Sequence, residues 1–248
     1  DITQGTLRVY DWDGESSNPW YFTTEESIPS GDIESEWYFA EGYTNEGFEE
    51  YICLQNPNQE EVKVEFQLMD PNGVGTRYLC TIPAERRFTL PVHDYFGGEV
   101  SARVISDGQI YAERSIYWGN KAEGHVSRGV AEPKNQWYLA EGCTGYGFDE
   151  WVCIMNPNDE IANLNVYYQT QEYGEIPKQY QVQPRSRYTI HVDDEKVDES
   201  PVLANVQVST YIESDQPIIA ERAMYWDMEG PAPKDSLGGS CAPGVWET

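Results

Sequence analysis

The stretch "EWYFAEG" (36–42) returns as "QWYLAEG" (136–142), and this echo decides how the chain is organised. Laying residue i on residue i+100 keeps the two stretches in register through "EYICLQNPN" (50–58) and "EWVCIMNPN" (150–158). A match over such a length predicts two tandem copies of one structural unit.

The second copy is longer than the first. Extra residues enter it around "EKVDESPV", after which "YAERSIYW" (111–118) matches "IAERAMYW" (219–226). In addition, "PWYFTTEE" (19–26) resembles the start of a copy, and the chain ends in "GVWET" (244–248), where a third copy would begin. These matches predict an N-terminal arm or partial unit (1–35), a first repeat (36–132), a second repeat (136–243) and a C-terminal tail (244–248).

Each repeat has the pattern of short β-strands separated by turns. "EVKVEFQLMD" (61–70) alternates apolar and polar residues, as a half-buried strand does, and Asn-Pro-Asn after "EYICLQ" is a turn signal. Strands of this kind recur about every ten residues, and no stretch shows a sustained helical period. We therefore predict an all-β protein with two tandem immunoglobulin-like antiparallel β-sandwiches and an N-terminal β arm.

The charge of the chain limits its partners. Asp and Glu number 43 against 16 Lys and Arg, which gives a formal net charge of −27. Such a surface repels nucleic acid and anionic lipid, so we expect neither as a partner. No apolar run is long enough to predict a membrane-spanning helix, and we expect no membrane insertion. The acidic excess fits a self-repelling surface, a chain that collects divalent cations, or a salt-rich habitat.

Two motifs carry a family resemblance. "WYLAEGCTGYGFDEWVCIMNPND" (137–159) and "SDQPIIAERAMYW" (214–226) resemble a tandem repeat of secreted and cell-surface proteins of bacteria and archaea, a domain of unknown function. The resemblance covers almost everything after residue 35. It implies a β-sandwich module, an extracellular or cell-surface location, and an adhesive or structural context. It supplies no catalytic residues.

The repeat also singles out carboxylates. Among those held in both copies are Glu41 with Glu141 and Glu113 with Glu221, and Arg114 and Arg222 follow the second pair. Two carboxylates could serve as a glycosidase acid/base pair. The alternative is that Glu41 with Arg114, and Glu141 with Arg222, tie the first strand of each repeat to a late one. We favour structural ties, because these must recur in every repeat, whereas catalytic sites are seldom duplicated intact.

Histidines and short motifs give no support to catalysis. His93, His125 and His191 show no metal-binding or triad spacing. The G-x-S-x-G, phosphate-loop and H-E-x-x-H patterns are absent as well. We expect no enzymatic function.

Duplicated aromatic residues have two interpretations. Trp37, Trp137, Trp118 and Trp226 are candidate contacts for a sugar-stacking platform. Such residues more often pack in a core or between domains, because each buries a large area. The sequence favours packing and leaves a carbohydrate-binding module as the alternative function, with a surface polysaccharide as its partner.

Two acidic clusters are candidates for calcium, the only cofactor we consider. "YDWDGE" (10–15) supplies Asp11, Asp13 and Glu15, and "DDEKVDE" (193–199) supplies Asp193, Asp194 and Glu195. The first cluster loosely resembles a calcium loop but lacks the later ligands. Solvated acidic loops are the simpler interpretation of both.

Five cysteines permit two disulfides. We predict a bridge between Cys53 and Cys80, and a second bridge between two of Cys143, Cys153 and Cys241. Buried free thiols are the alternative. An extracellular location favours oxidation.

Together these observations predict a non-catalytic extracellular structural module, a subunit of a surface layer, sheath, filament or adhesin. Incomplete units at both ends of the chain would leave unpaired sheet edges, which recruit strands from other chains. We therefore expect head-to-tail self-association, or a lateral contact between copies, through Leu7, Val9, Tyr10 and Trp246. The alternative is that the arm folds back on its own first repeat.

Overall fold

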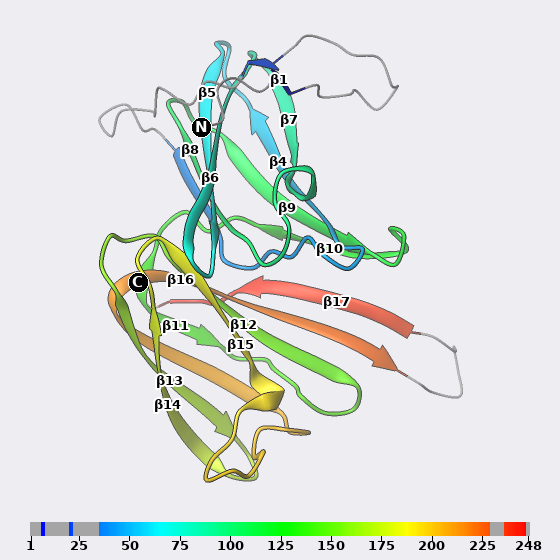
Figure 1. Cartoon of the computed structure of the whole chain (residues 1–248), viewed down its shortest axis with the longest axis vertical. Helices are drawn as coiled ribbons and strands as arrows, with labels where there is room; N and C mark the ends of the chain where they lie inside the picture. The colour runs from blue at the N-terminus through cyan, green and yellow to red at the C-terminus, as the bar shows by residue number, and fades with distance from the viewer. Residues whose placement is uncertain (1–5, 8–19, 22–34, 229–235, 247–248) are drawn as a thin grey trace.

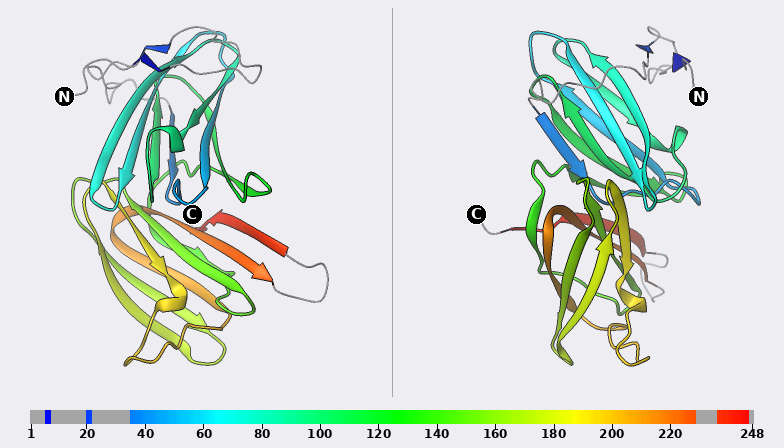
Figure 2. Two further views of the ribbon diagram at one scale, coloured as in Figure 1. Left: turned by 45° about the vertical axis from the view of Figure 1, so that its right-hand side comes forward. Right: turned by 60° about the vertical axis from the view of Figure 1, so that its left-hand side comes forward.

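The computed structural model describes residues 6–7, 20–21, 35–228 and 236–246. The chain is all-β, with antiparallel strands that form two β-sandwiches, one for each repeat. Figure 1 shows the first sandwich standing on the second, and the turned views in Figure 2 show the same arrangement. Within the described ranges, no helix is long and apolar enough to cross a membrane.

The first sandwich has two four-stranded sheets, ordered β3-β8-β5-β6 and β10-β9-β4-β7. Its strands are β3 (Ser35–Phe39), β4 (Glu49–Asn56), β5 (Val62–Asp70), β6 (Gly73–Ile82), β7 (Arg86–Pro91), β8 (Ser101–Ser106), β9 (Tyr111–Trp118) and β10 (Glu123–Arg128). A short 3₁₀ turn, η2 (Val92–Asp94), follows β7. This order departs from the ABED and CFG sheets of an immunoglobulin constant domain. The prediction of a β-sandwich is therefore confirmed, and the prediction of an immunoglobulin-like strand order is not.

The second sandwich repeats this plan with one difference. Its elements are β11 (Lys134–Leu139), β12 (Phe148–Asn156), β13 (Ala162–Thr170), β14 (Gly174–Val182), β15 (Ser186–His191), η3 (Val192–Asp194), β16 (Val208–Met228) and β17 (Ser236–Pro243). The first half of β16 pairs with β11 and β13, as β8 pairs with β3 and β5. Its second half pairs with β12 and β17, as β9 pairs with β4 and β10. One long strand thus takes the place of two.

Alternating side chains build the two cores. Along β4, Ile52 and Leu54 are buried against Val64 and Phe66 of β5 in the facing sheet. In a strand, successive side chains point to opposite faces, so the residues between them face outward. The second repeat has the same arrangement, with Val152 and Ile154 in its core cluster. This burial of apolar area is the main driving force for each sandwich.

The Asn-Pro-Asn turns are held by buried side chains. Asn56 donates hydrogen bonds to the carbonyl oxygens of Glu60, Ile82 and Pro83, at 2.9–3.0 Å. Asn156 repeats this pattern in the second sandwich, at 2.8–3.1 Å. An asparagine amide can satisfy several backbone groups at a turn in this way. The Asn-Pro-Asn turn signal therefore marks an asparagine whose side chain holds neighbouring strand ends together by hydrogen bonds.

The C-terminal residues complete the second repeat and do not begin a third. Val245 forms a bridge with Tyr138, as Val130 does with Tyr38 in the first repeat. The ring of Trp246 packs edge-on against that of Trp137, with centroids 5.3 Å apart. The expectation of an open unit at "GVWET" is therefore wrong, because Val245 and Trp246 have partners within the second repeat.

At the other end, two short strands are described. They are β1 (Thr6–Leu7) and β2 (Trp20–Tyr21), which pair with each other so that Leu7 lies opposite Trp20. Val9 and Tyr10, predicted to take part in assembly, lie outside the described residues, as do Asp11, Asp13 and Glu15.

The predicted disulfides are absent, because all five cysteines are free thiols. Cys80 points into the core of the first repeat from β6. Cys53 lies between the inward-facing Ile52 and Leu54 and so faces outward, beside Thr89 and Arg87. The strand alternation that builds the core thus separates the two sulfurs. Among Cys143, Cys153 and Cys241, no pair is bonded.

Candidate functional site at the junction of the repeats

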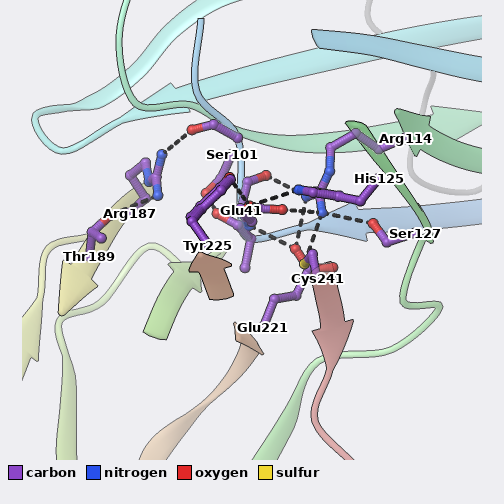
Figure 3. Close-up of polar contacts among 12 residues, drawn as sticks. Glu41, Ser101, Arg114, His125, Ser127, Arg187, Thr189, Glu221, Tyr225 and Cys241 are labelled. Carbon is purple, nitrogen blue, oxygen red and sulfur yellow. Dashed lines mark hydrogen bonds and ion pairs between the residues drawn. The ribbon is translucent and has the colours of Figure 1, made fainter. Parts of the chain in front are cut away.

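The two repeats meet where the end of the first sandwich rests on the outer face of the β17-β16-β12-β15 sheet of the second. The first repeat contributes Glu41 and Gly42, just after β3, and Arg114 from β9. The second contributes Glu221 and Tyr225 from β16, together with Cys241 from β17 and Arg187 from β15. Figure 3 shows Glu41, Arg114, Glu221, Tyr225 and Cys241 gathered at one place, with Arg187 to one side beside Thr189.

Arg114 is the centre of this junction and is fully buried. Its Nη2 lies 2.6 Å from Oε2 of Glu41, in its own repeat, and its Nη1 lies 2.9 Å from Oε2 of Glu221, in the other repeat. Nη1 also donates to the backbone oxygen of Glu41, and Nη2 to Oγ of Ser127 at 2.7 Å. One guanidinium therefore bridges two carboxylates from different repeats, a use that suits its fixed fork of donors.

Further hydrogen bonds cross the same junction. The backbone N–H of Glu41 donates to Oε2 of Glu221 at 2.7 Å, and the hydroxyl of Tyr225 donates to Oε1 of Glu41 at 2.8 Å. Arg187 donates from Nη1 to the backbone oxygen of Gly42 at 2.7 Å. Each of the two carboxylates thus accepts hydrogen bonds from two donors, which offset the cost of burying its charge.

The electrostatics of the junction keep the carboxylate of Glu41 charged. Burial opposes ionisation of Glu41, but the guanidinium of Arg114 and the nearby His125 hold the pKa of Glu41 below its ordinary range. Burial likewise opposes the charge on Arg114, while Glu221 and Glu41 raise its pKa well above the usual value. The pKa of Tyr225 is raised well above normal by burial and then by Glu41, so this residue stays a hydroxyl donor.

A second pair of carboxyl groups was not predicted: Glu50 lies at the junction, near Arg114, and Glu150 lies at the equivalent place in the second repeat, near Arg222. Glu50 and Glu150 are buried, and neither carboxyl oxygen of either residue has a hydrogen-bond partner among the described residues. A Cβ atom at Gly42 would lie 2.7 Å from Oε2 of Glu50, and one at Gly142 would lie 2.5 Å from Oε2 of Glu150. These glycines therefore leave room for the carboxyl groups.

Burial raises the pKa of Glu50 to about 8, although Arg114 opposes this shift. It raises the pKa of Glu150 to about 8 as well, against the effect of Arg222. Both groups are therefore neutral at neutral pH. The repeat alignment that identified Glu41 and Glu141 also aligns Glu50 with Glu150, so the signal was present in the sequence.

Both ties expected from the sequence bring their partners together. In the second repeat, Nη1 of Arg222 lies 2.8 Å from Oε2 of Glu141, with 65% of the Glu141 side chain exposed. Glu113, the counterpart of Glu221, is exposed on the outer face of the first repeat. The carboxylates held in both repeats thus have different surroundings in each.

The duplicated tryptophans are mainly packing residues. Trp37 is 6% exposed and Trp137 is fully buried, and each donates its indole N–H to a backbone oxygen at 3.0 Å. Neither ring offers a face to a sugar. Trp118 stacks on Phe48 and contacts Tyr225 edge-on at the junction, with centroids 5.5 and 5.3 Å apart. Trp226 packs against Phe148 at 5.7 Å.

The acidic loop of the second repeat does not turn its carboxylates to a common point. Asp193 accepts a hydrogen bond from the backbone N–H of Glu150, Asp194 contacts His191, and Glu195 pairs with Lys178. A different trio, Asp149, His191 and Asp193, brings its ligand atoms within 4.8 Å of one another. His191 lies between the two aspartates there, with its Nε2 in contact with Oδ1 of Asp149 and 3.7 Å from Oδ2 of Asp193.

No family model matches the chain, and no curated protein matches it. Among solved structures, it is similar to Thermotoga maritima 1070, with 18% identity and a TM-score of 0.38 over 46% of this chain and 96% of that one. It is also similar to the Anabaena sensory rhodopsin transducer, with 24% identity and a TM-score of 0.31 over 36% of this chain and 92% of that one. Both TM-scores are low, so neither similarity supports a conclusion about function.

Proposed function

We propose that this chain is a non-catalytic structural module, an extracellular subunit of a surface layer, sheath, filament or adhesin that assembles head to tail. The observation that carries the proposal is the bridge from Arg114 to Glu41 and Glu221, which is buried where the two repeats meet. Repeat proteins gain stability from such interfaces between neighbouring units. The extracellular location rests on the resemblance of the two repeat motifs.

The use of the carboxylates supports a structural role. Glu41 and Glu221 share one arginine and accept backbone or tyrosine donors, so their charges hold two repeats together. Glu113, which a catalytic interpretation would pair with Glu41, is exposed on the outer face of its sheet. These contacts favour interface formation over acid/base chemistry.

The assembly state tests this proposal. Sedimentation velocity over a wide concentration range, followed by negative-stain microscopy, should show oligomers or filaments that grow with concentration. A protein that stays monomeric at millimolar concentration would contradict self-assembly. A pull-down with insoluble polysaccharides tests the alternative, a carbohydrate-binding module that uses exposed aromatics. Retention on a polysaccharide by a monomeric protein would favour that alternative.

Calcium remains part of the proposal as a stabilising cation. Relief of self-repulsion at a net charge of −27 would add to any coordination energy. Millimolar calcium should raise the melting temperature more than sodium chloride of equal ionic strength does. Equal shifts from the two salts would limit the effect to screening.

A further inference from the structure

The second repeat receives the first through one face, which we call the receiving face. Five of its residues are Arg187, Thr189, Cys153, Glu221 and Tyr225, from β15, β12 and β16. Cys241 of β17 also contacts Arg114 there, at 3.1 Å. Glu221 bonds Arg114 and the backbone of Glu41, and Tyr225 bonds the carboxylate of Glu41. Thr189 also contacts Glu99 of the first repeat, at 3.1 Å. Every one of these residues is polar or small and lies on the outer side of its sheet.

The first repeat has the same face. At the five corresponding positions it carries Arg87, Thr89, Cys53, Glu113 and Tyr117, identical in type to those of the receiving face. The register agrees too, because Cys53 lies opposite Thr89 and Glu113, as Cys153 lies opposite Thr189 and Glu221. Inward-facing residues must match between repeats to build the same core. Outward-facing ones need not, so their identity points to a shared use.

This second face is uncovered by the described part of the chain. Arg87 and Glu113 are exposed, and so is Val126, which occupies the position of Cys241 and is 59% exposed. A hollow of about 780 Å³ opens on this side, lined by Cys53, Arg87, Tyr111 and Glu113 among others. By contrast, Cys153 and Glu221 are buried by the docked first repeat.

The partner surface is also duplicated. The end of the first repeat that docks, which we call the docking end, consists of Ala40, Glu41, Gly42, Phe48, Arg114 and Trp118. The second repeat carries Ala140, Glu141, Gly142, Phe148, Arg222 and Trp226 at these positions, again with identical residue types. Ala40 is fully buried, whereas Ala140 and Glu141 are exposed. Within the described residues, one receiving face and one docking end are therefore unoccupied.

We propose that the receiving face of the first repeat binds the docking end of the second repeat of another copy of this chain. This inference rests on the proposed head-to-tail assembly and names the surfaces that would form it. Arg222 would bridge Glu141 and the partner's Glu113, and Tyr117 and Arg87 would take the places of Tyr225 and Arg187. Such a contact is heterologous, so it builds an open filament unless the rotation between copies closes them into a ring.

A charge reversal on the receiving face tests the proposal. Glu113→Arg places a positive charge where Arg222 should bind and should abolish association without changing the melting temperature, because Glu113 is exposed. Glu61→Arg is the matched control, since Glu61 is also exposed, lies in the same repeat and changes the net charge by the same amount. In sedimentation velocity, the control should associate like the unmodified chain, and Glu113→Arg should stay monomeric.

Photo-crosslinking then locates the contact. With p-benzoylphenylalanine at position 117, mass spectrometry should place intermolecular adducts on Ala140–Gly142, Phe148 or Trp226. Adducts elsewhere on another copy, or association that survives Glu113→Arg, would overturn this inference and leave head-to-tail assembly standing. Adducts on residues 1–34 of the same chain would also overturn it, because the face would then be covered from within. If the unmodified chain never associates, the proposed function fails together with this inference.

Discussion

The same arginine–glutamate tie exists in two very different settings in the two repeats. Arg114 and Glu41 are buried, and Glu221 of the other repeat completes their contacts. Arg222 and Glu141 keep the pairing, but 65% of the Glu141 side chain is exposed. Because the residues are identical, the difference comes from the docking of one sandwich on the other. The energetic value of a conserved pair is therefore set by its neighbours.

The largest expected difference between the repeats follows from removing the arginine. Arg114→Met would leave Glu41 and Glu221 buried and unpaired, which should lower the free energy of unfolding by about 3–5 kcal/mol. Arg222→Met removes an arginine whose partner, Glu141, is largely exposed, and should cost about 1 kcal/mol or less. Urea denaturation of both variants checks this. Equal losses would show that docking does not determine the strength of the tie.

The glutamates across the junction should differ in the same sense. Glu221→Gln weakens the acceptor of two donors, Arg114 Nη1 and the Glu41 N–H, and should cost about 2 kcal/mol. Glu113→Gln alters an exposed residue and should stay within about 0.5 kcal/mol of the unmodified chain. The same denaturation assay measures both variants. If Glu221→Gln leaves the free energy of unfolding unchanged, the junction opens readily in solution.

A pH series probes the two buried carboxyl groups. The raised pKa values of Glu50 and Glu150, about 8, mean that the folded chain keeps protons that the unfolded chain releases above pH 4.5. Stability from each group is therefore full below pH 4.5 and is lost as the pH rises toward 8, by at most about 1.4 kcal/mol per pH unit. Glu50→Gln and Glu150→Gln should each flatten the fall in stability between pH 5 and 8.

Glu61→Gln serves as the control for this series, because it also removes one carboxylate, from an exposed position outside the proposed contact between copies. It should leave the pH dependence unchanged. If Glu50→Gln steepens the fall, or leaves it as it was, then Glu50 is ionised in the folded chain.

Thiol reactivity is the mildest test, since it changes no interaction. Cys53 is partly exposed, whereas its counterpart Cys153 is buried, and burial raises the pKa of Cys153 to about 12. A thiol reagent should therefore label Cys53 in the folded protein and spare Cys153. After unfolding without reductant, all five cysteines should react. Three reactive thiols would instead indicate one disulfide.

The sequence predicted the sandwiches and the two ties because both depend on patterns within one repeat. The alternation of apolar and polar residues in "EVKVEFQLMD" arises because one face of that strand points into the core. The pairing of Glu41 with Arg114 was predicted from the alignment of the repeats. The contacts at the junction cannot be predicted from patterns within one repeat. Glu113 and Glu221 occupy equivalent sequence positions, yet one is exposed and the other buried, so their surroundings depend on how whole sandwiches pack.

Two predictions were wrong because the sequence does not show which face of a strand a residue occupies or where a repeat ends. The predicted bridge from Cys53 to Cys80 failed because strand alternation places Cys53 outside the core. "GVWET" was read as the start of a third repeat, but Val245 pairs with Tyr138 and closes the second. For Cys53 the side-chain direction differs from the prediction, and for Val245 the pairing partner differs.

The long strand β16 has a mechanical consequence. In the first repeat, β8 ends at Ser106 and β9 begins at Tyr111, so a loop, which we call the joint, connects the two sheets. In the second repeat, β16 runs unbroken from Val208 to Met228 and belongs to both sheets. A pulling force along the chain would therefore load its pairs with β11, β12, β13 and β17 together. We expect the second repeat to rupture in a single step under tension, and the first to yield at its joint.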